Sequence, residues 1–204
     1  PFAREFHVGD GFDAAYYKRH IIELVLRIQE NNVLDAVAIS KIAAKDPLTA
    51  KDFSYYLYDE LGHDKMFFAD LKNMGISQED AESVDLFFST KVLMGYLHFA
   101  IRKDNAIPAI MWDWFLEYYS EKYNGFITSK AERHLGISCA KGAKAHVLTD
   151  KTEDHPALMF KLVRKIVKTE RDEQVAREYL ARCVELVGMY FRELHAATIE
   201  QPRN

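Results

Sequence analysis

The sequence predicts an all-α domain, folded as a bundle of seven or eight helices. Apolar residues recur with a 3.6-residue period along most of the 204 residues, and no stretch alternates apolar and polar residues as a half-buried strand does. Only nine glycines and five prolines punctuate this pattern, and they fall between the periodic stretches. The length suffices to bury a core without disulfide bonds. We therefore expect one domain over residues 1–204, with its core over about 12–197.

Local signals place the helices after an irregular lead-in over residues 1–10. Asp13 can cap the first helix, because its side chain can accept a bond from the first helical turn. Pro47 suits the first position of another helix. Ser77 followed by Asp80 suits a further start, since an acidic side chain there complements the helix dipole. The predicted helices cover 13–31, 34–45, 47–74, a short segment from 77, 86–102, 107–134, 140–155 with a continuation to 168, and 172–197.

Composition and charge argue against several classes of protein. The formal net charge is −4 and no basic patch stands out, so we expect no nucleic-acid partner. No apolar run reaches the roughly 18 residues of a transmembrane helix, so we expect no membrane association. Cys139 and Cys183 form no CxxC pair, which favours a reducing cytoplasm. Pro1 is an unusual start, and we expect further residues to precede it.

The first candidate site is the pair Glu60-x-x-His63. Residues three apart lie on one helix face, and the stripe that carries this pair is otherwise apolar, with Phe53, Tyr56 and Phe67. A carboxylate and an imidazole that face a core need partners, because an unpaired buried charge is unfavourable. A metal ion is one such partner, and Glu-x-x-His is an element of di-iron helical bundles. The alternative is a surface ion pair or a hydrogen-bonded core histidine.

The second candidate site is a cluster near Pro156. His146 and Asp150, four residues apart, share a helix face, and Glu153 lies close to it. His155 falls on nearly the opposite side of a straight helix. Pro156 should bend or break the helix, however, and a π-bulge there could turn His155 inward. Glu153 and His155 therefore remain alternatives for the last ligand, and a simple polar helix end is the other interpretation.

Two further glutamates are candidates. Glu117 is a lone acid among bulky aromatic residues, although Asp113 one turn earlier could instead mark a solvated face. Glu23 could supply a bridging carboxylate from the first helix. An ion pair between Glu23 and Arg27, four residues on, is the simpler account.

Oxygen and nitrogen ligands from several helices suit iron or manganese, and two ions need about six such side chains. Histidines would hold each ion, and carboxylates would bridge or shift between the two. The candidate metal ligands are Glu60, His63, Glu117, His146, Asp150 and His155, with Glu23 as a further candidate and Glu153 as the alternative to His155.

On these residues the sequence resembles the heme-oxygenase-like diiron oxidases, over about residues 12–195. In that family a Glu/His pair, a glutamate on the next core helix and a later His-x-x-x-Asp motif followed by a histidine hold the metals. The pair matches Glu60 and His63. The later motif then departs from the family pattern, because His155 follows Asp150 by five residues rather than three or four. Glu23 is the nearest match to the family's first-helix glutamate.

The resemblance implies a non-heme diiron oxidoreductase that activates O2 on a small carboxylate- or amine-bearing substrate in natural-product biosynthesis. Members of the family act on fatty acids and amino acids, and one forms a nitrile from a tryptophan. The dense aromatic residues favour an aromatic, tryptophan-like amino acid, for whose carboxylate Arg27 and Lys130 are candidate cations. Two irons, O2, an external electron donor and a homodimer are the implied cofactors and partners. The expected substrate pocket consists of Tyr56, Phe67, Trp112, Trp114 and Tyr118.

Four alternatives stand beside this reading. A fatty-acid oxidative decarboxylase would belong to the same family. A thiaminase-like hydrolase on the same fold would use Cys139 as nucleophile. A true heme oxygenase would need His20 as the iron ligand. A non-enzymatic helical binding protein would leave every polar residue named above on the surface or hydrogen-bonded in the core.

Overall fold

The computed structural model describes residues 3–200, which are almost entirely helical and include no strand. This confirms the all-α prediction. The longer helices are α2 (Ala14–Ala43), α3 (Pro47–Glu60), α4 (His63–Asn73), α6 (Phe88–Lys103), α7 (Ile107–Tyr119), α8 (Gly125–Leu135), α9 (Lys141–Glu153), α10 (His155–Ile166) and α11 (Glu170–Thr198). The short elements are α1 (Arg4–His7), α5 (Gln78–Ser83), a π-helical turn over Ser120–Asn124 and a 3-10 turn over Ile137–Cys139.

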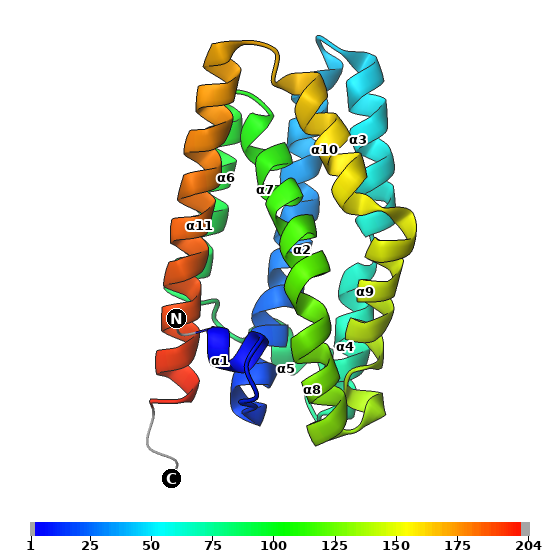
Figure 1. Ribbon diagram of the computed structural model, residues 1–204, viewed down its shortest axis with the longest axis vertical. Helices are drawn as coiled ribbons and strands as arrows, with labels where there is room; N and C mark the ends of the chain where they lie inside the picture. The colour runs from blue at the N-terminus through cyan, green and yellow to red at the C-terminus, as the bar shows by residue number, and fades with distance from the viewer. Residues whose placement is uncertain (1–2, 201–204) are drawn as a thin grey trace.

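Helix α2 runs through the bundle and packs against α3, α4, α6 and α11 (Figure 1). Helices α6 and α11 pair along one side of the bundle, while α3, α4, α9 and α10 form the other. Helix α7 lies between the two sides and contacts both α10 and α11. The segments that carry the predicted ligands, which are α3–α4, α7 and α9–α10, therefore share one half of the bundle.

Three predicted helix starts are confirmed by their caps. The Asp13 carboxylate accepts the backbone N–H of Tyr16 at 2.8 Å, Pro47 opens α3, and Ser77 forms a reciprocal capping box with Asp80. The prediction of an irregular lead-in over residues 1–10 is wrong for Arg4–His7, which form α1, and its first two residues lie outside the described range.

The predicted break between residues 31 and 34 is wrong, because α2 continues through it. Asn31 is not a helix end. Its side chain is buried and bonds to Asp35 on its own helix and to Asp113 and Trp112 on α7. These partners replace the solvent that usually draws asparagine to helix ends.

The chain breaks at two places beside candidate ligands, one of them not predicted and the other predicted. The expected helix 47–74 ends at Glu60 and restarts at His63, because Gly62 takes a left-handed conformation with φ of 99°. The break expected at Pro156 is confirmed, and it lies at Asp154, a non-glycine residue with φ of 52°. The predicted π-bulge near Pro156 is therefore wrong, and Pro156 instead lies in the first turn of α10.

The π-helical turn occurs elsewhere, between α7 and α8, where one uninterrupted α-helix over 107–134 is predicted. It begins at Ser120, a buried residue directly after the aromatic segment. Such turns are often found at functional sites, and this one lies along the cavity described below.

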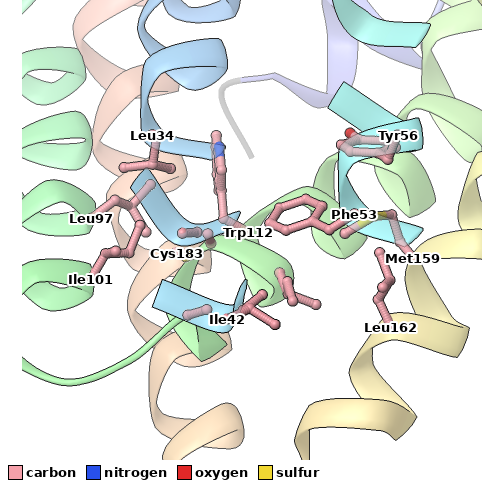
Figure 2. Close-up of a cluster of buried hydrophobic side chains, with 14 of the residues drawn as sticks. Leu34, Ile42, Phe53, Tyr56, Leu97, Ile101, Trp112, Met159, Leu162 and Cys183 are labelled. Carbon is pink, nitrogen blue, oxygen red and sulfur yellow. The ribbon is translucent and has the colours of Figure 1, made fainter. Parts of the chain in front are cut away.

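The main hydrophobic core lies next to the candidate site. Figure 2 shows Leu34, Phe53 and Trp112 pointing into this core together with residues of α6, α10 and α11. Each of the three is at most 2% exposed. Burying a side chain of this size stabilises a fold by about 1.5–3 kcal/mol. Across residues 3–200, no helix combines the length and the apolar character that crossing a membrane requires.

Candidate metal centre

The structure brings six of the predicted ligands together inside the bundle. They come from both sides of the Gly62 break, from α7, and from both sides of the Asp154 break. All six side chains are largely or fully buried. The residues are Glu60, His63, Glu117, His146, Asp150 and His155.

Short distances connect these side chains. Nδ1 of His63 is 3.0 Å from Oε2 of Glu60, and Nδ1 of His155 is 3.1 Å from Oε1 of the same carboxylate. Nδ1 of His146 is 3.0 Å from Oδ2 of Asp150. His155 Nδ1 also lies 3.8 Å from Oε2 of Glu117 and 3.9 Å from Oδ1 of Asp150.

Several of these close approaches are not hydrogen bonds. Among the described residues, Oε1 of Glu60, Oε2 of Glu117, Oδ1 of Asp150, and Nδ1 of His146 and His155 are buried without an aligned partner. Five such atoms in one place are unusual, because buried polar groups are nearly always hydrogen-bonded. Two ligand atoms bound at about 2.1 Å to one ion, at right angles, lie about 3.0 Å apart. The observed separations therefore fit lone pairs that converge on ions, so the residues present suit a metal.

Two of the three groups of potential ligand atoms found among the described residues share Glu60, and the third consists of Asp59, Glu153 and His155. Potential ligand atoms of Glu60, His63 and His146 all lie within 4.8 Å of one another, and so do those of Glu60, Glu117 and His155. Asp150 is within reach of a histidine in each group. A shared carboxylate between two three-residue groups is the arrangement that a pair of bridged ions requires.

The structure places the two alternatives for the last ligand differently. Glu153 is 44% exposed, and its Oε2 accepts a hydrogen bond from Nε2 of His155 at 3.0 Å. That bond leaves Nδ1 of His155 facing the cluster. Glu153 is thus placed to orient a ligand, as carboxylates commonly do behind metal-bound histidines.

Glu23 is buried but lies outside the cluster. Its oxygens accept from Arg19 at 2.6 Å, from the Phe87 backbone at 2.9 Å and from the Thr90 hydroxyl at 2.7 Å. The ion pair with Arg27 that the spacing predicts is not formed, because Arg19 takes that position.

Mutual charges set the protonation of the metal-free cluster. Burial alone would raise the pKa of Glu60, but the close imidazoles of His155 and His63 outweigh this and lower the pKa to about 2. Burial would lower the pKa of His155, yet the close Glu60 carboxylate and the nearby Glu117 carboxylate raise it to about 9. Burial raises the pKa of Glu117 well above its usual value, and repulsion from Glu60 and Asp150 adds to this increase. The hydroxyl of Tyr56 donates to Oε1 of Glu117 at 2.7 Å.

A cavity of about 110 Å³ adjoins the cluster, and Glu60, Glu117, His146 and Asp150 form part of its wall. Of the five residues expected to form the substrate pocket, Tyr56, Phe67 and Trp112 line it. The other two do not. Tyr118 is 46% exposed, and Trp114 stacks on it with ring centroids 5.9 Å apart.

The sequence analysis missed a buried acidic pair beside the cluster. The suggestion that Asp113 marks a solvated face is wrong, since Asp113 and Asp35 are both 0% exposed. The two carboxyl groups share a hydrogen bond, and Asn31 donates to both, at 3.0 Å to Asp113 and 3.2 Å to Asp35. Burial raises the pKa of both groups, that of Asp113 to about 7. The i, i+4 spacing of Asn31 and Asp35 was the available sequence signal.

Because of this pair, we expect the free energy of unfolding to depend on pH. Asp113 gains its proton near pH 3.8 when unfolded but near pH 7 when folded, so stability falls as pH rises through this interval. In metal-free protein at pH 8, Asp113→Asn should therefore raise the free energy of unfolding by about 2 kcal/mol, or roughly 4–8 °C in Tm. Calorimetric scans at pH 4 and pH 8 measure this, and the gain should vanish at pH 4. An exposed control, Glu121→Gln, should change neither value, and an equal gain at both pH values would contradict the prediction.

Three residues with other expected roles, as nucleophile, heme ligand or substrate cation, lie outside the cavity or are hydrogen-bonded to other groups. Cys139 is buried and does not line the cavity. Nδ1 of His20 is bonded to the Tyr190 hydroxyl at 2.7 Å, and the adjoining cavity is far too small for a porphyrin. Lys130, a candidate cation for substrate, donates to the carbonyls of Glu5, Gly9 and Gly11.

Comparison with known proteins identifies the fold. No protein-family model matches the sequence, and no curated protein sequence matches it either. A domain of unknown function with a heme oxygenase-like fold from Shewanella denitrificans superposes with a TM-score of 0.78 at 18% identity, covering 100% of this chain and 90% of that one. A TenA homolog from Pseudomonas syringae pv. tomato superposes with a TM-score of 0.73 at 11% identity, covering 95% of this chain and 83% of that one. The chain therefore has the heme oxygenase-like fold that its ligand pattern predicts.

Proposed function

We propose that the protein is an O2-dependent non-heme diiron oxidoreductase. The proposal depends on one observation: five buried ligand atoms without an aligned partner lie in one cluster, four of them on residues of the two groups that share Glu60. The heme oxygenase-like fold is compatible with this function. A binding protein without a metal would have no reason to keep so many buried polar atoms unpaired.

Each side chain has a defined part in this proposal. His63 and His146 would hold one ion, Glu117 and His155 the other, and Glu60 would bridge them, with Asp150 beside both. The ions would supply the electron transfer to O2 that no side chain can provide. Glu153 fixes the tautomer of His155 by accepting a hydrogen bond from its Nε2–H group.

Tyr56 and the apolar wall support the same chemistry from outside the metal ligands. Tyr56 donates to Oε1 of Glu117, while the other oxygen, Oε2, lies 3.8 Å from Nδ1 of His155, so the tyrosine holds the carboxylate in place. The wall of Phe67, Trp112 and Phe115 limits the access of bulk water to the cavity. A reductant outside the chain would return the electrons between turnovers.

The substrate we propose is a small carboxylate- or amine-bearing molecule, with an aromatic amino acid as the specific candidate. The cavity is compact and partly aromatic, and at about 110 Å³ it suits one ring better than a long acyl chain. A tryptophan-like substrate that is converted to a nitrile remains within this class. A long fatty acid fits a cavity of this volume less well, so oxidative decarboxylation of such an acid is the less favoured reaction.

Anaerobic loading with Fe(II), followed by O2, tests the proposal. We expect about two irons per chain by elemental analysis, consumption of O2, and a transient visible absorption whose lifetime changes when a substrate candidate is present. Absence of bound iron, manganese or any other transition ion under all loading conditions would overturn it.

Metal affinity should also depend on pH. His155 carries a proton up to about pH 9, and this proton must leave before Nδ1 can bind an ion. We therefore expect the apparent Kd for Mn(II) to fall at least about tenfold per pH unit between pH 6 and 8. Calorimetric titrations in buffers of different ionisation enthalpy would measure both the affinity and the proton release. A pH-independent affinity without proton release would contradict this prediction.

A further inference from the structure

The cavity beside the metal centre has a second polar end, formed by Arg27 of α2. Among the described residues that line the cavity, Arg27 is the only arginine or lysine. It lies on the same face of α2 as Leu24, Ile28 and Asn31, which also line the cavity. One helix face therefore presents a cation to the space that the metal ligands border.

Arg27 has no carboxylate partner within residues 3–200. No acidic oxygen there lies within 4.0 Å of its guanidinium, because Glu23, four residues before it, is paired with Arg19 instead. The guanidinium packs over the ring of Tyr190 at 4.3 Å from the centroid, and the Tyr190 hydroxyl is bonded to His20. This packing and a hydrogen bond to the Tyr190 side chain fix the position of the cation, while the remaining N–H groups of the guanidinium can bind a ligand.

The charges around the cavity are separated in space. Glu60, Glu117 and Asp150 border it from α3, α7 and α9, while Arg27 borders it from α2. An anionic ligand group would be attracted to the end of the cavity that the arginine borders, away from the end that the acids border. The wall includes Trp112, Phe115 and Phe191, which suit an apolar body.

We propose that Arg27 binds the carboxylate of the substrate, so that the cavity takes a small organic carboxylate with an apolar body. The guanidinium can bind both carboxylate oxygens through parallel N–H bonds. The opposite end of the molecule then faces the metal ligands. The assignment of this ligand as a substrate rests on the proposed oxidoreductase function. The binding of a carboxylate by Arg27 does not depend on that function.

Binding to metal-free protein tests the assignment. The probes are 3-phenylpropionate and hexanoate, each beside its neutral amide, measured by isothermal titration calorimetry. The two acids differ in their apolar body, one ring against a short flexible chain, so they test which shape a cavity of about 110 Å³ accepts. We expect wild type to bind at least one acid about 10- to 100-fold more tightly than its amide.

Substitutions of Arg27 identify the group responsible. Arg27→Gln should lower the affinity for the acid about 10- to 100-fold and leave the affinity for the amide unchanged. Arg27→Lys should bind the acid more tightly than Arg27→Gln but less tightly than wild type. The exposed Arg164→Gln is the matched control and should behave as wild type. Equal weakening of acid and amide, no change in Arg27→Gln, or no binding of either acid by folded wild type would each overturn the proposal.

Failure of the Arg27 proposal can be distinguished from failure of the proposed diiron function. Iron content should be the same in Arg27→Gln and wild type, because Arg27 is not among the ligands. If wild type prefers the acid through Arg27 but never binds a transition ion, only the diiron function fails. If iron binds and O2 is consumed while acid and amide bind equally, only the role of Arg27 fails.

Discussion

Glu60→Ala is expected to remove both metal ions and abolish O2 consumption. Glu60 belongs to both groups of converging ligand atoms, so its loss leaves His63 and His146 on one side and Glu117 and His155 on the other with no bridge. We expect metal content to fall from about two ions per chain to near zero, and O2 consumption to fall at least about a hundredfold. Elemental analysis and an oxygen electrode measure the two effects.

Two other variants sharpen this expectation. His63→Ala touches one group only, so it should lose one ion more readily than the other while also stopping turnover. Glu121→Ala alters an exposed side chain paired with Lys122 and should leave metal content and turnover unchanged. Full iron content in Glu60→Ala would contradict the shared-ligand arrangement, whatever its activity.

Gly142→Ala is expected to have the largest effect on stability among single-methyl additions. A Cβ at Gly142 would lie 1.9 Å from the backbone oxygen and 2.5 Å from the backbone carbon of Met66. The Asp70 carboxylate accepts the N–H groups of Gly142 and Ala143, both at 2.8 Å, which holds α9 against α4. Because backbone cannot move aside as a side-chain tip does, we expect a loss of about 3 kcal/mol or more, and roughly 6–12 °C in Tm.

The same substitution should weaken metal binding without touching a ligand. Helices α4 and α9 carry His63 and His146, and separating these helices moves the two imidazoles apart. Gly95→Ala is the control, since no atom lies within 4 Å of its added Cβ. That variant should be neutral or stabilised by up to about 1 kcal/mol in thermal unfolding. Equal Tm values for the two variants would contradict the close packing of α4 on α9.

Much of the ligand set could be predicted from sequence because its signals are local. Glu60 with His63, and His146 with Asp150, share a helix face at spacings that any helix imposes. Helix starts at Asp13, Pro47 and Ser77 are equally local, because a cap depends on the next three residues. The structure adds their convergence in space, while metal binding itself stays a prediction.

What could not be predicted depends on contacts between distant segments. Asp113 looks like a surface acid until α2 supplies Asn31 and Asp35 against it. Glu23 could be paired with either arginine one turn away, and only the packing of α6 selects Arg19. Pro156 predicts a break in this region, but not that the break lies at Asp154, because aspartate only occasionally adopts a left-handed conformation.

The π-helical turn after α7 has a consequence for how this chain can vary. A π turn accommodates one residue more than an α turn, and each α-helical residue advances the helix by about 100°. Deleting one residue within 120–124 would therefore convert the π turn into an α turn and leave α8 close to its present rotation, whereas a deletion in a regular α turn would rotate the following helix by roughly that angle. Lys130 would keep the three carbonyls that it holds, and Ile127 would stay in the core. The π turn therefore marks a place where this chain can change its length by one residue without changing the phase of the side chains on α8.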